Sequence, residues 1–333
     1  MGCFLIGVTG KEYTTSGEAL LGSVSDDPYD VRTFVRSHHP QGRLSHVGTE
    51  LVTTRPPSFA ERGYFCQEGD TSRGVNSAGL AFTCAILFEN ETLPKKEKRI
   101  SFSILTKEIM ELCRNVPDAL KHIQNAGAVE PPFSILLADS EGRIAHVEAG
   151  GFGVEVVHQF STESPGAVFA VNCYQSKRST KHNNPAAGSE LSTNNNGVRL
   201  QRGQELSEKW KGRIDKEVLA KILSDHANRE RDPETNPLLD AWGFSICNHG
   251  TRKSDQKSDR DLPWGTVSGE ILQPKEKTLH YCYGWPCGEK PEFGDQLYQE
   301  NSWGNFRPFT IRDNFQGGHV NMLTTPEGAE EPQ

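Results

Sequence analysis

The stretch Cys3-Phe4-Leu5-Ile6-Gly7-Val8-Thr9 opens the 333-residue chain with a compact run of apolar and β-branched residues. Polar and turn-forming residues follow at positions 11–17, and positions 18–24 return to strand-forming residues. Two strand-forming runs separated by a short turn predict a β-hairpin. The fold is therefore expected to start from a hairpin whose first strand begins with a cysteine.

The position of Cys3 gives its thiol a chemical possibility that the other cysteines lack. At a true N-terminus the α-amine, with a pKa of roughly 8, is a built-in base beside the most nucleophilic common side chain. Gly2 is small enough to permit removal of Met1, and the Gly2–Cys3 bond is open to attack by the thiol itself. The structural alternative is a cysteine that merely starts a buried strand.

An acidic residue follows the returning strand of the hairpin. Asp26 can come back beside Cys3 and orient its amine or thiol by hydrogen bonding. Asp27 is a local rival for the same role, and an acid in a turn before Pro28 is the structural alternative.

The rest of the chain alternates between strand and helix signals. Apolar residues at helical spacing predict a helix over residues 104–125, which Asn115-Val116-Pro117-Asp118 resets before a second short helix at 119–123. A polar stretch at 181–196 predicts a surface loop or active-site rim. Further predicted strands are 79–88, 133–138, 144–148, 154–158, 264–272 and 278–283, and a further helix is 216–227. This order fits a layered α+β domain.

Composition excludes several classes of protein. The net charge of −8 and a pI near 5.8 argue against a nucleic-acid binder. No apolar stretch approaches the roughly 20 residues of a membrane span. No secretory signal is visible, so a cytoplasmic location is expected. The eight cysteines include no Cys-x-x-Cys pair, and neither a metal nor an organic cofactor is predicted. A homo-oligomer is left open.

Short motifs occur in a specific order along most of the chain. They are Gly2-Cys3, Gly17-Glu18-Ala19-Leu20-Leu21-Gly22 followed by Asp26, Gly74-Val75-Asn76-Ser77-Ala78-Gly79-Leu80-Ala81, Phe169-Ala170-Val171-Asn172, Leu223-Ser224-Asp225-His226, Ser245-Ile246-Cys247 and Gly284-Trp285-Pro286-Cys287. In this order they resemble the penicillin acyltransferase family, the acyl-coenzyme A:6-aminopenicillanic acid acyltransferase-like branch of the N-terminal-nucleophile hydrolases. The similarity covers residues 2–288.

The resemblance implies a four-layer αββα sandwich formed by a single catalytic domain at residues 3–326. Residues 1–2 would be a leader removed on maturation, by autocleavage between Gly2 and Cys3, and residues 327–333 a tail. Cys3 would be the nucleophile, Asp26 the acid near it, and Asn172 the donor to the oxyanion. Without the resemblance, Asn172 would be interpreted as an asparagine that holds a turn at a strand end.

Two departures from the family pattern concern arginine. Family members often carry an arginine after the Ile-Cys pair, whereas here Asn248 and His249 follow. Arg252, Arg199 or Arg202 could replace it, and Arg252 and His249 are the candidates named for substrate binding. Related bile-salt hydrolases also place an arginine between the nucleophile and the aspartate, and no arginine lies between Cys3 and Asp26.

These features predict an amidohydrolase that acts on carbon–nitrogen bonds through a thioester acyl-enzyme. Its partner would be a small-molecule amide or acyl thioester. The same site could serve an acyltransferase that passes the acyl group to an amine. Two rivals remain: a catalytically inactive binding protein of the same fold, and a thiol–histidine hydrolase that uses His249 or another histidine as its base.

Overall fold

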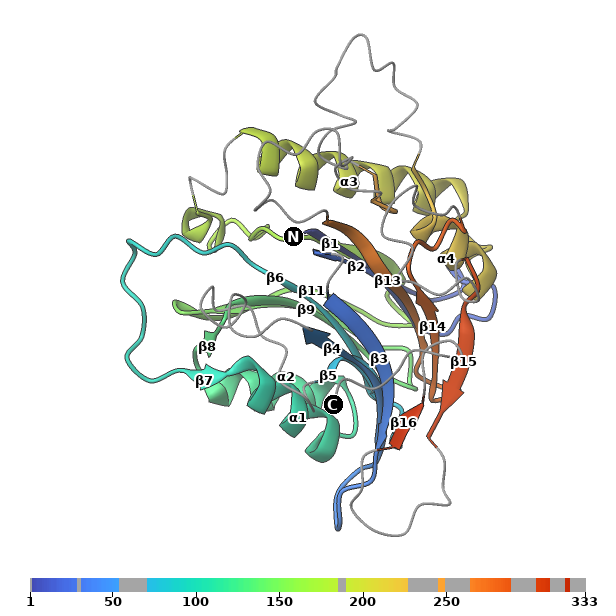
Figure 1. Ribbon diagram of the computed structural model, residues 1–333, viewed down its shortest axis with the longest axis horizontal. Helices are drawn as coiled ribbons and strands as arrows, with labels where there is room; N and C mark the ends of the chain where they lie inside the picture. The colour runs from blue at the N-terminus through green and yellow to red at the C-terminus, as the bar shows by residue number, and fades with distance from the viewer. Residues whose placement is uncertain are drawn as a thin grey trace.

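A computed structural model describes residues 2–28, 31–53, 71–184, 190–226, 245–248, 264–288, 304–311 and 321–323. Two stacked sheets lie between two layers of helices (Figure 1). The predicted αββα sandwich is therefore confirmed. His249, Arg252 and the predicted tail 327–333 lie outside the described residues.

The first sheet contains the N-terminal strand. Within the described residues it has six strands, in the order β12 (Gly166–Ala170), β1 (Gly2–Thr9), β2 (Leu20–Pro28), β13 (Trp264–Gln273), β14 (Thr278–Tyr283) and β15 (Arg307–Thr310). All five strand pairs are antiparallel. The predicted hairpin is β1–β2, and the tertiary structure inserts β2 between β1 and β13.

The second sheet has eight strands within the described residues. Their order is β11 (Gly153–Phe160), β10 (Ile144–Gly150), β9 (Phe133–Ala138), β6 (Ala81–Ile86), β5 (Thr71–Asn76), β4 (His46–Thr53), β3 (Val31–His38) and β16 (Asn321–Leu323). The predicted meander is β9–β10–β11. A separate parallel pair joins β7 (Ile100–Ser101) to β8 (Val129–Glu130).

Helices cover the outer face of each sheet (Figure 1). α1 (Phe102–Leu112) and α2 (Val116–Ala126) cover the eight-stranded sheet, and α3 (Glu190–Lys209) and α4 (Lys216–Leu223) cover the six-stranded sheet. The predicted break in the first helical stretch is present, because the Asn115 side chain accepts a hydrogen bond from the Asp118 backbone and starts α2 there. Within the described residues, no helix is both long and apolar enough to cross a bilayer.

Three apolar clusters fill the spaces between the four layers, and strand alternation decides which residue enters which cluster. On β1, Leu5 packs between the two sheets, whereas Phe4 and Ile6 pack against α3 and α4. On β6, Phe82 packs against Leu105 of α1. Successive side chains of a strand point to opposite faces, so β1 and β2 each contribute side chains both to the core between the sheets and to the core under α3 and α4.

The prediction of a polar loop over residues 181–196 is wrong in its second part. α3 begins at Glu190 and runs for 20 residues. Its N-terminal turns are rich in asparagine and serine, which are weak helix formers, so local propensity does not reveal the helix. The helix is stabilised instead by tertiary packing, since Leu206 and the buried Arg199 of α3 pack against the six-stranded sheet.

Candidate active site

Strand pairing brings Asn172 beside Cys3. β1 pairs antiparallel with β12, with Leu5 opposite Ala170, so two residues further along Cys3 meets Asn172. The backbone N–H of Cys3 donates to Asn172 Oδ1 at 2.5 Å. Both residues are buried. The nitrogen that would become the α-amine is therefore held by a side-chain amide.

Two further contacts determine the orientation of the Asn172 amide. Its Nδ2 donates to the carbonyl of Ile86 at 2.8 Å, and Arg199 Nη2 donates to its Oδ1 at 3.5 Å. An amide nitrogen carries two N–H groups, so one remains beyond the bond to Ile86. The sequence predicts that Asn172 donates a hydrogen bond to an oxyanion. In the structure its side-chain oxygen accepts a hydrogen bond from the backbone N–H of Cys3.

Asp26 lies on the face of β2 that is turned toward α3. Leu21 packs between the sheets and Val24 packs toward the helices, so strand alternation places Asp26 on the side of Val24. Arg199 Nη1 lies 2.8 Å from Asp26 Oδ2, and Thr266 Oγ1 donates to Asp26 Oδ1 at 2.7 Å. Burial raises the pKa of Asp26 to about 6, although Arg199 and Thr266 favour the carboxylate.

Arg199 thus connects two of the predicted site residues. It is fully buried and contacts both Asp26 and Asn172. Of the three arginines considered as replacements for the missing family arginine, Arg202 pairs instead with Asp225 at the surface of α3. Arg252 lies outside the described residues.

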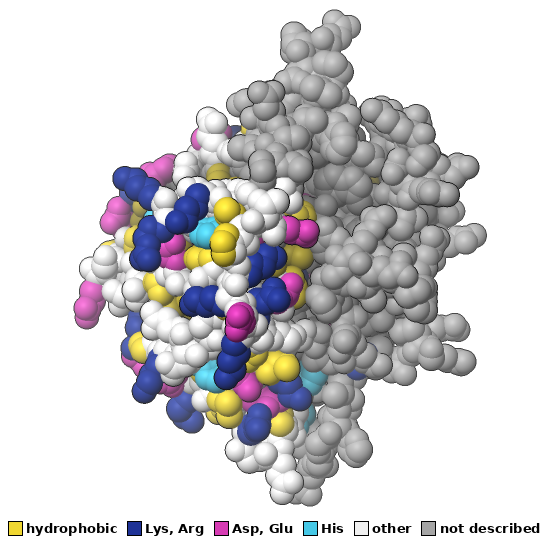
Figure 2. Space-filling model, turned by 90° about the vertical axis from the view of Figure 1, so that its left-hand side faces the viewer, with side chains coloured by type: hydrophobic (Ala, Val, Ile, Leu, Met, Phe, Trp, Pro, Cys, Tyr) yellow, Lys and Arg dark blue, Asp and Glu magenta, His cyan; other side chains and the backbone are white. Residues whose placement is uncertain are grey.

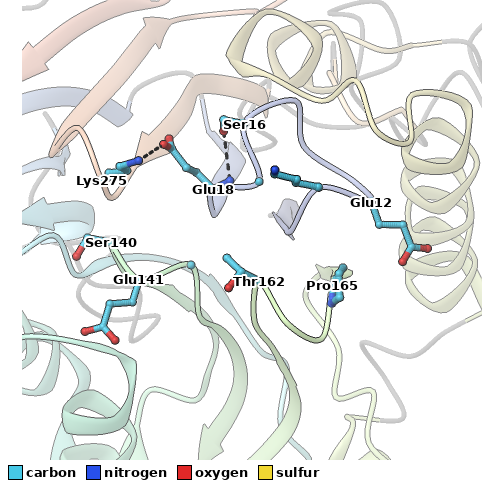
Figure 3. A pocket seen from close by; sticks show the side chains of 11 residues that line it. Glu12, Ser16, Glu18, Ser140, Glu141, Thr162, Pro165 and Lys275 are labelled. Atoms are coloured by element: carbon cyan, nitrogen blue, oxygen red, sulfur yellow. Dashed lines mark hydrogen bonds and ion pairs between the residues drawn. The ribbon is translucent and has the colours of Figure 1, made fainter.

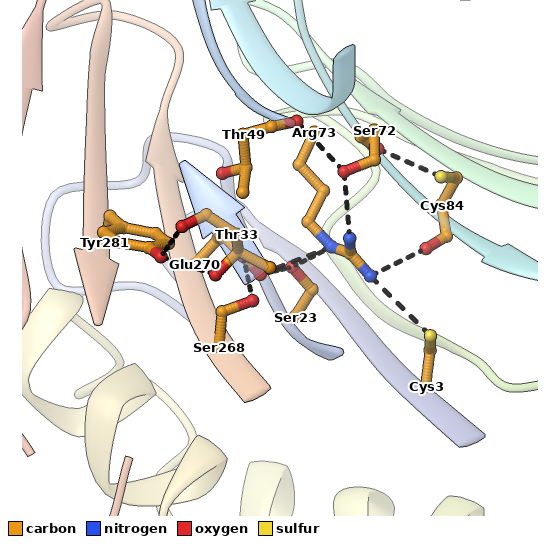
Figure 4. Close-up of polar contacts among 10 residues, drawn as sticks. All are labelled: Cys3, Ser23, Thr33, Thr49, Ser72, Arg73, Cys84, Ser268, Glu270 and Tyr281. Atoms are coloured by element: carbon orange, nitrogen blue, oxygen red, sulfur yellow. Dashed lines mark hydrogen bonds and ion pairs between the residues drawn. The ribbon is translucent and has the colours of Figure 1, made fainter. Parts of the chain in front are cut away.

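The thiol of Cys3 faces the opposite way, into the space between the sheets, where it meets Arg73 of β5 (Figure 4). Arg73 Nη2 lies 3.7 Å from Cys3 Sγ and also donates to the carbonyl of Cys84 at 3.2 Å. Its Nη1 donates to Ser72 Oγ at 3.2 Å. Arg73 is almost completely buried, so its position is determined by these contacts.

A buried carboxylate balances the charge of Arg73 (Figure 4). Glu270 Oε2 lies 3.3 Å from Arg73 Nε. Ser23 donates to the same oxygen at 3.0 Å, and Ser268 donates to Oε1 at 2.7 Å. Burial alone would lower the pKa of Arg73, but the charge of Glu270 raises it overall, so the guanidinium stays protonated.

The thiol itself is in a mixed environment. Burial raises the pKa of Cys3, Arg73 opposes that rise, and the charges of Asp27 and Asp26 add to it. The resting side chain is therefore a thiol rather than a thiolate. Deprotonation needs a base in contact with it, with Arg73 placed to receive the charge that forms.

Sequence reasoning named Cys3, Asp26 and Asn172, and the structure places all three around the start of β1. It missed Arg73, Glu270 and Thr266. An arginine within a short strand such as Thr71–Asn76 is usually assigned to an exposed edge, so no local signal pointed to Arg73.

A second concavity lies at the other end of the β1–β2 hairpin, where its turn is (Figure 3). It has a volume of about 400 Å³ and is lined by Glu12, Glu18, Glu141 and Lys275 among others. Lys275 is paired with Glu18 at 2.5 Å. β1 runs from Cys3 toward this turn, so the concavity lies at the opposite end of the strand and does not belong to the cysteine site.

Comparison with solved structures places the same architecture in known enzymes. A mutant of conjugated bile acid hydrolase from Clostridium perfringens aligns with a TM-score of 0.54 and 11% identity over 98% of this chain and 97% of that chain. A second variant of that enzyme gives 0.54 and 10% over 96% and 97%. Penicillin V acylase from Agrobacterium tumefaciens gives 0.48 and 12% over 84% and 83%. The two alignments with the bile acid hydrolase show a shared fold, which is that of the N-terminal-nucleophile hydrolases.

Comparison at the sequence level identifies the family. No match is found among curated proteins. The family model of acyl-coenzyme A:6-aminopenicillanic acid acyl-transferase matches residues 28–263, which is more than half of the chain. The matched segment includes Arg73, Asn172 and Arg199, while Cys3 and Asp26 precede it. The chain belongs to the acyl-coenzyme A:6-aminopenicillanic acid acyl-transferase family.

Proposed function

We propose that this protein is an N-terminal-cysteine amidohydrolase that cleaves a linear amide bond of a small molecule. One observation carries the proposal: the nitrogen and the sulfur of Cys3 are held separately, the nitrogen by Asn172 and the sulfur by Arg73. An N-terminal nucleophile needs this separation, because its amine must act as a base while its thiol acts as a nucleophile. The family assignment supports an enzyme that forms or breaks bonds between acyl groups and nitrogen.

Maturation would use the same two groups. The Cys3 thiol attacks the Gly2 carbonyl carbon, a C–S bond forms, the Gly2–Cys3 C–N bond breaks, and the nitrogen takes the thiol proton. Water then hydrolyses the thioester and releases the residues before Cys3. Asn172 Oδ1, which accepts from the Cys3 nitrogen, holds the leaving nitrogen in place.

In the catalytic cycle the free α-amine removes the thiol proton, and Arg73 stabilises the thiolate. The thiolate attacks the amide carbon, and the second N–H of Asn172 Nδ2 is assigned to the oxygen that becomes negative; such a donor typically contributes on the order of 10²–10³ in rate. The ammonium then protonates the leaving amine as the C–N bond breaks. The amine next takes a proton from water as the water oxygen attacks the thioester carbon. The C–S bond breaks, and the ammonium returns the proton to sulfur, which restores the thiol and the free amine.

Asp26 and Arg199 have positioning roles in this scheme. Their ion pair lies on the far side of the strand from the thiol and reaches the reacting atoms through Asn172. The Asp26 carboxylate holds Arg199, and Arg199 donates to the same Asn172 oxygen that receives the Cys3 nitrogen. The pair therefore orients the group that holds the base.

The test is the intact mass and N-terminal sequence of the purified protein, with Cys3→Ala as the matched control. We expect the wild-type chain to begin at Cys3 and the variant to retain Gly2. The mature protein is then assayed against a panel of N-acyl amines, with hydroxylamine added to trap a thioester. A wild-type chain that retains Gly2 and cleaves no amide would refute the proposal and favour the binding protein or a histidine-assisted thiol.

Acyl transfer is the second candidate, and the family name favours it. Water and an amine would compete for one thioester, so the two activities share Cys3, Asn172 and Arg73. The ratio of hydrolysis to transfer, measured with an acyl thioester and increasing amine, distinguishes them. A product that forms only when an amine is present would identify a transferase.

A further inference from the structure

Two loops that lie far apart in the sequence line an open basic pocket on one side of the molecule, together with the turn between β10 and β11. The pocket has a volume of about 660 Å³, which is in the range of small-molecule sites. One wall is the loop after β6, with Lys95 and Lys96, and the other is the loop after β12, with Lys177, Arg178 and Lys181. Figure 2 looks onto this side and shows Lys and Arg side chains gathered around a small apolar and histidine patch.

The charge of this pocket is opposite to that of the whole chain. Five cationic side chains line it, against one acidic residue, Glu155, whereas the chain carries a net charge of −8. Lys95 is paired with the buried Glu89 at 3.3 Å. In the part of the chain that the structure describes, no carboxylate pairs with Lys177, Arg178 or Lys181. Among the described residues, these three cations therefore have no ion-pair partner that a ligand would have to displace.

Buried carboxylates hold the second loop in place. Glu148 accepts from the Gln175 backbone at 2.6 Å and from the Ser179 hydroxyl, on either side of the unpaired cations Lys177 and Arg178. Pairing between the loops adds to this, since Asn90 N–H donates to the His182 carbonyl at 2.7 Å. The backbone that carries the cations is therefore positioned before any ligand binds, which reduces the entropy lost on binding.

An aromatic stack lies between the cations. Phe152 and His182 are stacked with ring centroids 4.3 Å apart and 12° between planes, and Phe152 packs edge-on against Tyr174 at 5.3 Å. The neighbouring charge of Lys181 contributes to the lowered pKa of His182, after the larger effect of burial. The pocket therefore offers concentrated positive charge beside an apolar surface.

The pocket is also joined to the candidate active site. Tyr174 follows Asn172 by two residues, so roughly 7 Å of chain separates them. Ile86, whose carbonyl binds Asn172, begins the loop that carries Lys95 and Lys96. Both walls of the pocket thus extend from residues that hold the nitrogen of Cys3.

We propose that this pocket is a binding site for a polyanionic, phosphate-bearing small molecule. Clustered cations favour a ligand with two or more closely spaced negative charges, and the pocket volume of about 660 Å³ suits a small molecule. The site is distinct from the cysteine chemistry and does not depend on it.

The test is calorimetric titration of the full-length protein with inorganic tripolyphosphate. The variant replaces Lys177, Arg178 and Lys181 by alanine. The matched control replaces Lys211, Lys216 and Lys275 by alanine, three lysines that are each paired with a carboxylate elsewhere. Both variants lower the net charge by three. Circular dichroism checks that each one is folded.

We expect saturable binding that weakens as salt rises from about 0.01 to 0.2 M, because the Debye length shrinks over that range. The pocket variant should lose about tenfold or more in affinity, and the control variant should stay within about twofold of wild type. Cys3→Ala protein should bind equally well, which separates this proposal from the proposed catalysis. The absence of saturable binding, or an equal loss in both triple variants, would overturn it.

Discussion

The buried ion pair of Asp26 and Arg199 allows a quantitative prediction. Both side chains are completely buried, and their charged atoms are 2.8 Å apart. Asp26→Asn keeps the shape and the contact with Thr266 but leaves the guanidinium without its anion. The remaining contacts of Arg199 Nη2, to Asn172 and Asn196 oxygens at 3.5 and 3.4 Å, are long and uncharged. Removing one partner of a buried pair typically costs about 3–5 kcal/mol of the free energy of unfolding.

Urea denaturation at pH 8, where the Asp26 carboxylate is ionised, measures this cost. With an m-value of about 3 kcal/mol/M, the Asp26→Asn midpoint should fall by roughly 1 M or more. The double variant Asp26→Asn/Arg199→Met buries no charge at this position. It should therefore be less destabilised than the sum of the two single variants, by about 1–3 kcal/mol.

A second ion pair made by an arginine of α3 serves as the control. Arg202 and Asp225 are 2.7 Å apart, but their side chains are 24% and 13% exposed. Breaking this pair by Asp225→Asn should cost about 1 kcal/mol or less, because water screens it. Equal losses for Asp26→Asn and Asp225→Asn, or strict additivity in the double variant, would refute the interpretation of Asp26–Arg199 as a tightly coupled buried pair.

Three further predictions concern pH and reactivity. The double variant Arg73→Met/Glu270→Gln removes both partners of the buried pair, so it leaves no unpaired buried charge. It should raise the pKa of Cys3 and slow alkylation of Cys3 by iodoacetamide at pH 7 by about tenfold or more. An unchanged alkylation rate would exclude Arg73 as the group that stabilises the thiolate. Because the pKa of Asp26 is about 6, kcat/KM should fall as pH drops through that value, since protonation of Asp26 releases Arg199. The Asp26→Asn variant should not show this fall. If the fall persists in the variant, another group causes it. Burial lowers the pKa of His146 to about 3, below its ordinary value of 6.5, so the unfolded chain binds the proton first and stability is lost as pH falls from 6.5 toward 3. Urea denaturation at several pH values measures the free energy of unfolding. In His146→Gln the decrease of this free energy between pH 6.5 and 3 should be about 3–5 kcal/mol smaller than in wild type. An unchanged pH dependence would contradict this account.

Several elements were predictable because their signals are local. The hairpin β1–β2 and the meander β9–β10–β11 follow from strand-forming runs separated by turns. The break between α1 and α2 follows from the Asn115 cap and the proline after it. Gly79 follows Asn76-Ser77-Ala78 and has a φ of 88°, a conformation that glycine adopts readily. Each of these features depends on a few neighbouring residues.

Part of the candidate site could also be predicted from the sequence. Cys3 stands out by position, and Asp26 follows from the length of the hairpin, which sets Gly2 opposite Asp26. What the sequence could not indicate is that Asp26 and the Cys3 thiol lie on opposite faces of their sheet. The face is decided by which side packs against the second sheet and which against α3.

The sequence alone determined the strand hairpin, the nucleophile candidate and the family resemblance, because those depend on short-range order along the chain. The tertiary structure alone decided which charges surround the nucleophile. Arg73 reaches Cys3 across 70 residues, and Arg199 reaches Asp26 across 173. Arginine carries no local signal for burial, and it tolerates burial only where a distant carboxylate meets it. Such partners are created by the stacking of the two sheets and the docking of α3, which no stretch of sequence specifies by itself.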